Sequence, residues 1–172
     1  MIPKIGSTVI YGTNGVCRVE DLREEDFGSS RGMFYVLRSL SEKKGTVIYL
    51  PADNEALLDS LKPLMSAEEL ARLAHATDPA DGEVWPRDAR LRNKLCKEML
   101  ATGDRTQLIL LIKSLVRDGR RDSAQGKKIS AATEALLTRA QAMLYEEFSL
   151  AYDMKEEELI PFLFGECDCP AK

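Results

Sequence analysis

The sequence predicts an α+β protein, with a small antiparallel β-barrel at the N-terminus and an all-helical domain after it. Two observations carry this prediction. Short β-prone runs joined by turn residues fill residues 6–50, whereas capping residues and helical periodicity dominate from residue 66 onward. The break around Lys62-Pro63-Leu64 separates them, so we place a β domain at 1–61 and a helical domain at 62–172, with an acidic extension over about 153–172.

The first strands follow from their β-branched and aromatic content and from the turns between them. The Asn14-Gly15 pair is a strong signal for a tight turn. Strands are expected at residues 7–11, 16–22, 33–40 and 46–50, with a polar loop or irregular hairpin tip over 23–32 and a short helical turn over 54–61. Strands this short, joined this tightly, favour a closed barrel of Tudor or SH3 type.

The helices are predicted from their caps. Ser66 and Glu69 have the spacing of a capping box, so a helix should run from about residue 67 to 75. Asp104 should cap a helix that ends near Gly119, and a polar, basic linker over 120–128 should follow. Ser130 should cap a long helix with an apolar stripe of Leu137, Ala140, Leu144, Phe148 and Ala151, and Asp153 a last, acidic helix over 155–164.

The only tryptophan, Trp85, stands at the entrance of one more helix. Pro86 disfavours a helical conformation of Trp85 and is itself well suited to the first helical position. The helix should therefore run from Pro86 to about Thr102 and close at Gly103. Two interpretations remain open at this point: Trp85 packs the helix start onto a core, or it is an exposed aromatic that contacts nucleic acid.

The charge distribution favours the second interpretation. The whole chain has a net charge of −4, but residues 85–128 contain 12 basic and 5 acidic side chains. The flanking segments, 1–84 and 129–172, carry balances of −5 and −6. Because phosphate binding depends on the local field, a basic block within an acidic chain is compatible with a nucleic-acid contact.

The sequence offers no catalytic or cofactor site. It contains neither a glycine-rich phosphate loop nor histidine, cysteine and carboxylate residues at a usable spacing, so we expect no enzyme activity, metal or cofactor. Cys17 and Cys96 are isolated. Cys167 and Cys169, with Glu166 and Asp168 beside them, have side chains that could bind a soft metal, but a frayed tail is the favoured interpretation. No apolar run approaches the roughly 18 residues of a membrane span, and no signal peptide is visible, so a cytoplasmic location without membrane contact is expected.

Several stretches resemble a known family. Residues 4–16 (KIGSTVIYGTNGV), the core strand at 35–37 and the Tyr49-Leu-Pro51 end of the fourth strand resemble the polymerase-interacting domain of CarD/CdnL-type bacterial transcription regulators, which the transcription-repair coupling factor shares. Trp85, the Ala101–Asp104 junction, the leucine-rich helix over 108–116 and the helix over 136–151 are similar to the helical domain of CarD. The similarity covers roughly residues 2–152.

This resemblance implies a non-enzymatic regulator that binds the RNA polymerase β subunit and promoter double-stranded DNA at the upstream edge of the transcription bubble. We expect the protein to be a monomer. The tryptophan would wedge into the minor groove, without reading sequence, and slow bubble collapse. The implied DNA contacts come from the basic block and are Trp85, Arg87, Arg90, Arg92, Lys94, Lys127 and Lys128. The implied polymerase contacts are Arg23, Glu25, Thr46, Val47 and Tyr49. Through polymerase the protein would associate with the nucleoid.

The chain departs from the family pattern in its expected polymerase contacts. Tyr49 stands where the family has an arginine, and a second polymerase-facing arginine falls on Glu25, with Arg23 nearby. The runner-up hypothesis is a Tudor- or SH3-like protein-interaction module with a helical self-association domain and no DNA role. In that case the basic block is a solvated face and Trp85 a core residue.

Overall fold

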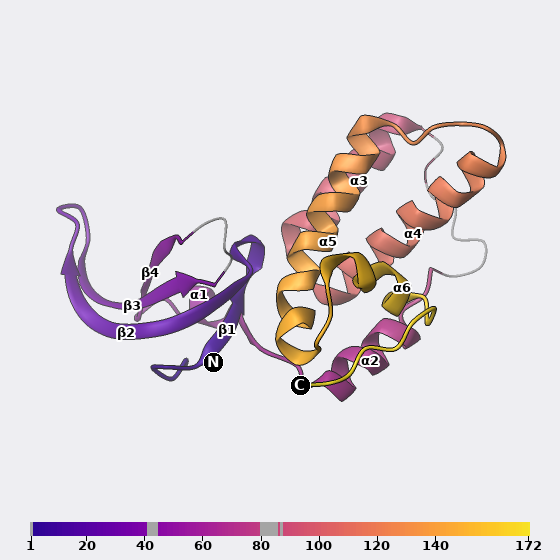
Figure 1. Ribbon diagram of the computed structural model, residues 1–172. Helices are drawn as coiled ribbons and strands as arrows, with labels where there is room; N and C mark the ends of the chain where they lie inside the picture. Colours follow the sequence, from indigo (N-terminus) through magenta and orange to yellow (C-terminus); the bar gives the residue numbers. More distant parts are fainter. Residues whose placement is uncertain (1, 41–44, 80–85, 87) are drawn as a thin grey trace. The chain divides into compact units, whose positions relative to one another are not determined.

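The computed structural model describes residues 2–40, 45–79, 86 and 88–172 (Figure 1). The chain divides into two compact units, Met1–Leu64 and Met65–Lys172. The first is a sheet and the second is helical, which confirms the α+β class. The division falls three residues after the boundary expected from the sequence, because residues 61–63 form a short strand of the sheet.

The N-terminal unit is a five-stranded antiparallel sheet with the order β4-β3-β2-β1-β5. Its strands are β1 (Thr8–Tyr11), β2 (Val16–Asp26), β3 (Arg31–Ser39), β4 (Val47–Pro51) and β5 (Leu61–Pro63). The prediction of a closed barrel is wrong, because β4 and β5 lie at opposite edges of an open sheet. Closure requires the two edge strands to pair. Here β5 has three residues, and the short helix α1 (Glu55–Asp59) packs against both β4 and β5.

The polar stretch over 23–32, expected to be a loop or an irregular hairpin tip, is mostly strand and forms the end of the β2–β3 hairpin. β2 continues to Asp26 and β3 begins at Arg31, so the tip is four residues long, closed by a hydrogen bond from the Phe27 N–H to the Ser30 carbonyl. Arg31 pairs with Glu24 across the strands at 3.0 Å. The hairpin is largely exposed, so it lacks the alternation of apolar and polar residues from which strands are predicted.

A β-bulge in β2 decides which residues reach each face of the sheet. Val19 pairs with Leu37, but the next pair is Asp21 with Val36, so the register shifts by one residue. Without this shift, the period of two would put Asp21 on the same face as Val19. One face buries the apolar core, made of Val9, Cys17, Val19, Tyr35, Leu37, Leu50, Leu58 and Leu61. The other, the outer face, receives Asp21, Arg23 and Glu25 from β2.

The helical unit contains α2 (Ala67–Ala76), α3 (Ala89–Thr102), α4 (Arg105–Ala124), α5 (Ala131–Ala151), the 3₁₀ turn η2 (Glu156–Glu158) and α6 (Leu159–Leu163). Most predicted caps are confirmed. Ser66 and Glu69 form the capping box, Asp104 accepts from the Gln107 N–H, and Ser130 accepts from the Thr133 N–H. Gly103 closes α3 with a positive φ of 59°. The core joins residues of all these helices, among them Leu70, Cys96, Ile109, Ile112, Leu144 and Phe148.

Two helix ends differ from their predictions. α3 begins at Ala89 with Asp88 as its cap, so Pro86 is not its first residue. α4 does not stop at Gly119 but continues to Ala124 and takes in the first half of the predicted linker. A glycine costs a helix only about 1 kcal/mol, and the residues that follow it include good helix formers. Gly119 is buried against Ile129, whose Cδ1 would lie 2.6 Å from an added Cβ.

The C-terminal segment is folded, so the prediction of a frayed tail is wrong. The Asp153 N–H donates to the Pro170 carbonyl, and the Lys172 N–H donates to the Ala151 carbonyl, each at 2.9 Å. Met154, Leu159, Phe162 and Leu163 are buried in the helical core. Asp153 is not the cap expected from the sequence, since the cap position of η2 is Lys155. The last residues of the chain thus fold back onto the end of α5.

Candidate functional site

Three of the expected polymerase contacts meet on the outer face of the sheet. Arg23 Nε donates to Glu25 Oε1 at 2.7 Å, and a terminal nitrogen of Arg23 donates to the Tyr49 hydroxyl at 3.4 Å. The Arg23 guanidinium carbon lies 6.0 Å from the centre of the Tyr49 ring. The hydrogen bond to Glu25 raises the pKa of Arg23, so the guanidinium stays charged. The bulge in β2 makes this meeting possible, because it brings Arg23 and Glu25 to the face that carries Tyr49.

Phe27 belongs to the same surface, although sequence reasoning missed it. Its ring packs edge-on against Tyr49, with centroids 5.1 Å apart, and against Phe34 at 5.3 Å. Phe27 remains 50% exposed. The signal was present in the sequence, since Phe27 is the only large apolar residue between Arg23 and Gly32. We call Arg23, Glu25, Phe27 and Tyr49 the outer-face cluster.

The other two expected polymerase contacts lie at the start of β4. Val47 is 36% exposed. Because it lies two residues before Tyr49 on β4, it shares the face of the sheet that carries Tyr49. Val47 pairs in register with Arg38, which donates to Glu20 and lowers the pKa of that carboxyl. Thr46 precedes β4, and its carbonyl accepts a hydrogen bond from the Ser39 N–H at 3.0 Å. Val47 thus extends the outer-face cluster, whereas Thr46 helps to hold the edge strand.

The expected DNA contacts that the structure describes lie on α3 and in the connection between α4 and α5. Trp85 and Arg87 lie outside the described residues. Arg90 and Lys94 are one turn apart on α3, and Lys97, which was not predicted, follows on the same side. These three residues line a shallow groove of about 520 Å³ together with Asn93, Glu98 and Ala101. Lys94 and Glu98 approach to 3.8 Å, so one carboxylate partly offsets the three positive charges.

Arg92 does not join this row. Two residues after Arg90, it is turned by about 200° around the helix axis. It lies one turn before Cys96, a buried core residue. Burial raises the pKa of the Cys96 thiol, and the nearby charge of Arg92 offsets only part of that increase. The structure therefore separates Arg92 from the row formed by Arg90, Lys94 and Lys97.

Lys127 and Lys128 lie in the connection between α4 and α5, and both are exposed. α3 packs against α4, and α4 against α5. As Figure 1 shows, the start of α3 and the α4–α5 connection lie at the same end of the helical unit. The Lys127 N–H donates to the Asp122 carbonyl at 2.9 Å, which fixes its backbone on the end of α4. The exposed cations of two separate segments therefore share one end of the unit.

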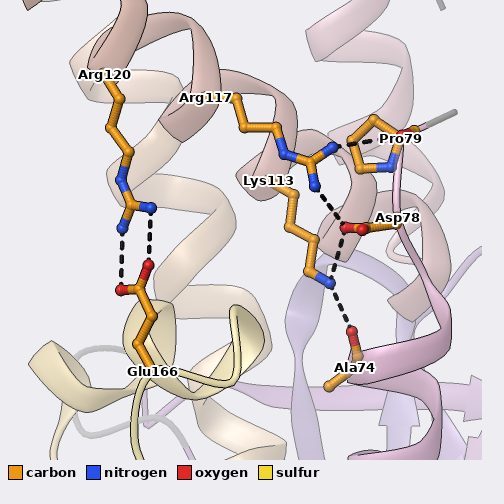
Figure 2. A network of polar contacts seen from close by, with 7 residues as sticks. All are labelled: Ala74, Asp78, Pro79, Lys113, Arg117, Arg120 and Glu166. Atoms are coloured by element: carbon orange, nitrogen blue, oxygen red, sulfur yellow. Dashed lines mark hydrogen bonds and ion pairs between the residues drawn. The ribbon is translucent and has the colours of Figure 1, made fainter. Parts of the chain in front are cut away.

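Other cations of the basic block are occupied within the protein (Figure 2). Lys113 is only 3% exposed and its ammonium donates to the Ala74 carbonyl at 2.8 Å and to Asp78 at 3.2 Å. Arg117 pairs with the same carboxylate at 3.1 Å, and Arg120 pairs with Glu166. Charge counting alone therefore overstates the positive field that this block offers to a ligand.

The described residues contain no group of three or more His, Cys, Asp or Glu side chains that could hold a metal ion. Cys167 and Cys169 both pack against the helical core. Burial, together with the neighbouring Cys167, raises the pKa of Cys169 to about 11, so its thiol is protonated at neutral pH. Among the helices that the structure describes, none is both long and apolar enough for a transmembrane span.

Two protein-family models match this chain, one for each unit. The model described as the CarD-like/TRCF RID domain matches residues 4–63. The model described as the CarD C-terminal domain matches residues 70–163, which is more than half of the chain. Both matches agree with the resemblance noted in the sequence, and they occur in the order expected from it.

Proposed function

Since this chain belongs to the CarD family of transcription-related regulators, a non-catalytic family, we propose that it stabilises the open promoter complex of bacterial RNA polymerase. The observation that carries this proposal is the presence of both domains in one chain. A domain of the first type alone would also fit a coupling factor, whereas the second is the CarD C-terminal domain. In the proposed mechanism, the first unit binds polymerase and the second binds DNA.

We propose that the outer-face cluster is the contact with the polymerase β subunit. Arginine and aromatic side chains are enriched in protein interfaces and provide most of their binding energy. Tyr49 replaces a family arginine, but the Arg23 side chain donates to its hydroxyl at 3.4 Å. The Arg23 guanidinium therefore lies beside position 49. Phe27 and Val47 add exposed apolar surface next to it.

We propose that Arg90, Lys94 and Lys97 of α3, with Lys127 and Lys128, bind phosphates of the promoter DNA. Such contacts orient a protein on the duplex but do not read sequence. Trp85 would then act as the wedge, since apolar side chains inserted at a base step unstack it and bend the duplex. Arg87 is assigned to the same contact by its place next to Trp85 in the sequence. Arg92, on another side of α3, is left out of it.

The expected energies make polymerase necessary for DNA binding. If four phosphate contacts form, log K falls with log salt with a slope of about −3.6. With so few contacts, we expect the protein alone to bind DNA weakly. Tethering through the β subunit raises the effective concentration at the promoter. A wedge that favours the open state by about 1.4 kcal/mol shifts the balance between closed and open complex tenfold.

The wedge is tested with Trp85→Ala in a promoter-opening assay with the full-length protein and its cognate polymerase. We expect the lifetime of the open complex to fall by up to about tenfold, while binding to polymerase is retained. Arg139→Ala, which removes an exposed cation from the middle of α5, serves as the control. If the lifetime of the open complex is unchanged in Trp85→Ala while polymerase binding is retained, the proposed mechanism is wrong.

The polymerase contact is tested with Arg23→Ala in a pull-down with the β subunit. Arg31→Ala is a matched control, because β2–β3 pairing places Arg31 on the opposite face of the same hairpin. We expect Arg23→Ala to weaken β-subunit binding about tenfold or more, and Arg31→Ala to leave it unchanged. Equal losses in both variants would contradict the assignment. Recovery of another partner, without DNA protection at the bubble, would favour a general interaction module.

A further inference from the structure

Cys167 and Cys169 lie next to each other in the folded C-terminal segment. One residue separates them in the sequence, and a hydrogen bond joins their thiols. Both residues are half-buried and pack against the helical core. By contrast, Cys17 and Cys96 are 0% exposed and lie in different units of the protein. The four cysteines are thus two enclosed, separate thiols and one paired, partly accessible dithiol.

The backbone is held by hydrogen bonds on both sides of this dithiol. Glu166 directly precedes it, and the Glu166 N–H donates to the Pro161 carbonyl at 2.8 Å. Pro170 directly follows it, and the Pro170 carbonyl accepts from the Asp153 N–H at 2.9 Å. Because both flanking residues are attached to the helical unit, the fold itself keeps the two sulfur atoms close together.

The spacing of the two cysteines allows a disulfide bond between them. The Cα atoms of two residues separated by one other lie at most about 7 Å apart, and a disulfide requires roughly 4.4–6.8 Å. The chain at Asp168 therefore has only to avoid full extension. A ring this small strains the bond, and strained disulfides are the labile ones. Where cells keep thiols reduced, disulfides are usually transient and serve catalysis or redox sensing.

We propose that Cys167 and Cys169 are a redox-active dithiol, which a low-molecular-weight disulfide oxidises to a reversible intramolecular disulfide. In the first step, the Cys167 thiolate attacks one sulfur of the oxidant and expels the other as a thiolate. Cys169 then loses its proton to solvent, attacks the Cys167 sulfur and expels the second thiolate. The protein gives up two protons and two electrons, which convert the oxidant into two thiols.

The surroundings decide which of the two thiols reacts first. Burial and the neighbouring Cys167, together with the carboxylates of Glu158 and Asp168, raise the pKa of Cys169 to about 11. Few molecules therefore carry a Cys169 thiolate at neutral pH, and the attack on the oxidant falls to Cys167. Once Cys167 is bound in the mixed disulfide it carries no charge, so its contribution to the raised pKa of Cys169 is lost. Cys169 then acts as the resolving thiol.

The test incubates the folded, full-length protein with mixtures of oxidised and reduced glutathione, quenches with acid, alkylates free thiols and analyses tryptic peptides by mass spectrometry. Trypsin cleaves after Lys155, so the peptide 156–172 contains both cysteines of the pair and no other. We expect this peptide to lose two hydrogen atoms and both alkylation sites, and dithiothreitol to restore them. Cys17 and Cys96 are internal controls and should remain thiols throughout.

Two variants test the order of the steps, and circular dichroism before oxidation confirms that each is folded. Cys169→Ser should stop at the mixed disulfide, with glutathione attached to Cys167. Cys167→Ser should react with oxidised glutathione about threefold or more slowly than Cys169→Ser, and equal rates would overturn the assigned order.

The experiment on the unmodified protein decides the proposal even if a variant fails to fold. The proposal is wrong if Cys167 and Cys169 remain open to alkylation at every glutathione ratio. It is also wrong if the protein keeps a stable mixed disulfide with glutathione, or if the bond forms between two protein molecules. None of these outcomes depends on the proposed role in transcription, so the two proposals stand or fall separately.

Discussion

Arg120 of the basic helix α4 donates two parallel hydrogen bonds, of 2.8 and 3.0 Å, to the Glu166 carboxylate of the C-terminal segment. The acidic end of the chain is thus bound to the basic block through a defined pair. Inhibition of DNA binding by this acidic end would predict that deletion of residues 153–172 strengthens binding. Because residues 153–172 also supply core side chains, such a deletion removes part of the fold and does not test inhibition.

The first prediction concerns Phe162, which is 4% exposed and lies between Phe148 and Tyr152, at centroid distances of 5.9 and 4.9 Å. Phe162→Ala should destabilise the helical unit by about 3–5 kcal/mol, through lost burial and the cavity left behind. Urea unfolding followed by far-UV circular dichroism measures this loss. Leu150→Ala, an exposed position on α5, should change stability by no more than about 0.5 kcal/mol. A small effect at Phe162 would mean that the C-terminal segment is not part of the core.

The second prediction concerns the buried pair of Arg105 and Glu147. The Glu147 carboxylate accepts two hydrogen bonds from Arg105, one of 2.8 Å, and a third from the Met65 N–H at 2.8 Å. Glu147→Ala leaves a largely buried guanidinium without this partner, so the free energy of unfolding should fall by about 3–5 kcal/mol. Glu157→Ala, at an exposed position, is the control. The double variant Arg105→Met with Glu147→Leu should regain most of the stability that Glu147→Ala loses. If the double variant is less stable than Glu147→Ala, this account is wrong.

The third prediction is a pH dependence at Glu166. Its hydrogen bonds with Arg120 lower the pKa of the carboxyl from its ordinary value of 4.5. A carboxyl whose pKa is lower in the folded state stabilises the fold above its unfolded pKa, and this contribution disappears as the pH falls through the folded pKa. The wild-type protein should therefore have a higher melting temperature than Glu166→Gln at pH 7. The difference should shrink as the pH falls below 4.5 and vanish once the pH lies below the lowered pKa of Glu166. A difference that persists in acid would show that the charge of Glu166 is not its cause.

The fourth prediction uses the contact between Gly119 and Ile129. Alanine is favoured over glycine in a helix by about 1 kcal/mol, but a Cβ at 119 would meet Ile129 Cδ1 at 2.6 Å. Ile129 is 40% exposed, so its side chain can move at some cost. Gly119→Ala should therefore stabilise α4 more in an Ile129→Ala background than in the wild type. Thermal unfolding of the four variants measures the coupling; equal effects in both backgrounds would exclude the contact as the reason for the glycine.

Local chemistry made the starts of α2, α4 and α5 predictable. Ser66, Asp104 and Ser130 each bind a backbone N–H within three residues, so their role depends only on the neighbouring sequence. The end of α4 was not predictable in the same way. Gly119 is a helix terminator by composition, but it lies inside α4 against Ile129, a contact that appears only once α4 and the following connection are folded.

The candidate site shows the same division. The identities of Arg23, Glu25 and Tyr49 were expected from the resemblance, and Arg90 and Lys94 from the basic block. Their arrangement was not, because the register shift after Val19 decides that Arg23 and Glu25 reach the face of Tyr49. Likewise, counting charges does not distinguish the basic residues that are exposed from those that form ion pairs within the protein.

The sequence by itself determined the α+β order and the main helix caps, since each depends on residues close together in the chain. It also identified the family, through motifs whose order extends over most of the chain. The tertiary structure decided the open sheet, the outer-face cluster and the folded C-terminal segment. It also separated the cations that stay exposed, such as Lys94, from those held inside, such as Lys113. The physical reason is that ion pairing and burial join residues far apart in sequence: Asp78 and Lys113 are 35 residues apart, and Arg120 and Glu166 are 46 apart.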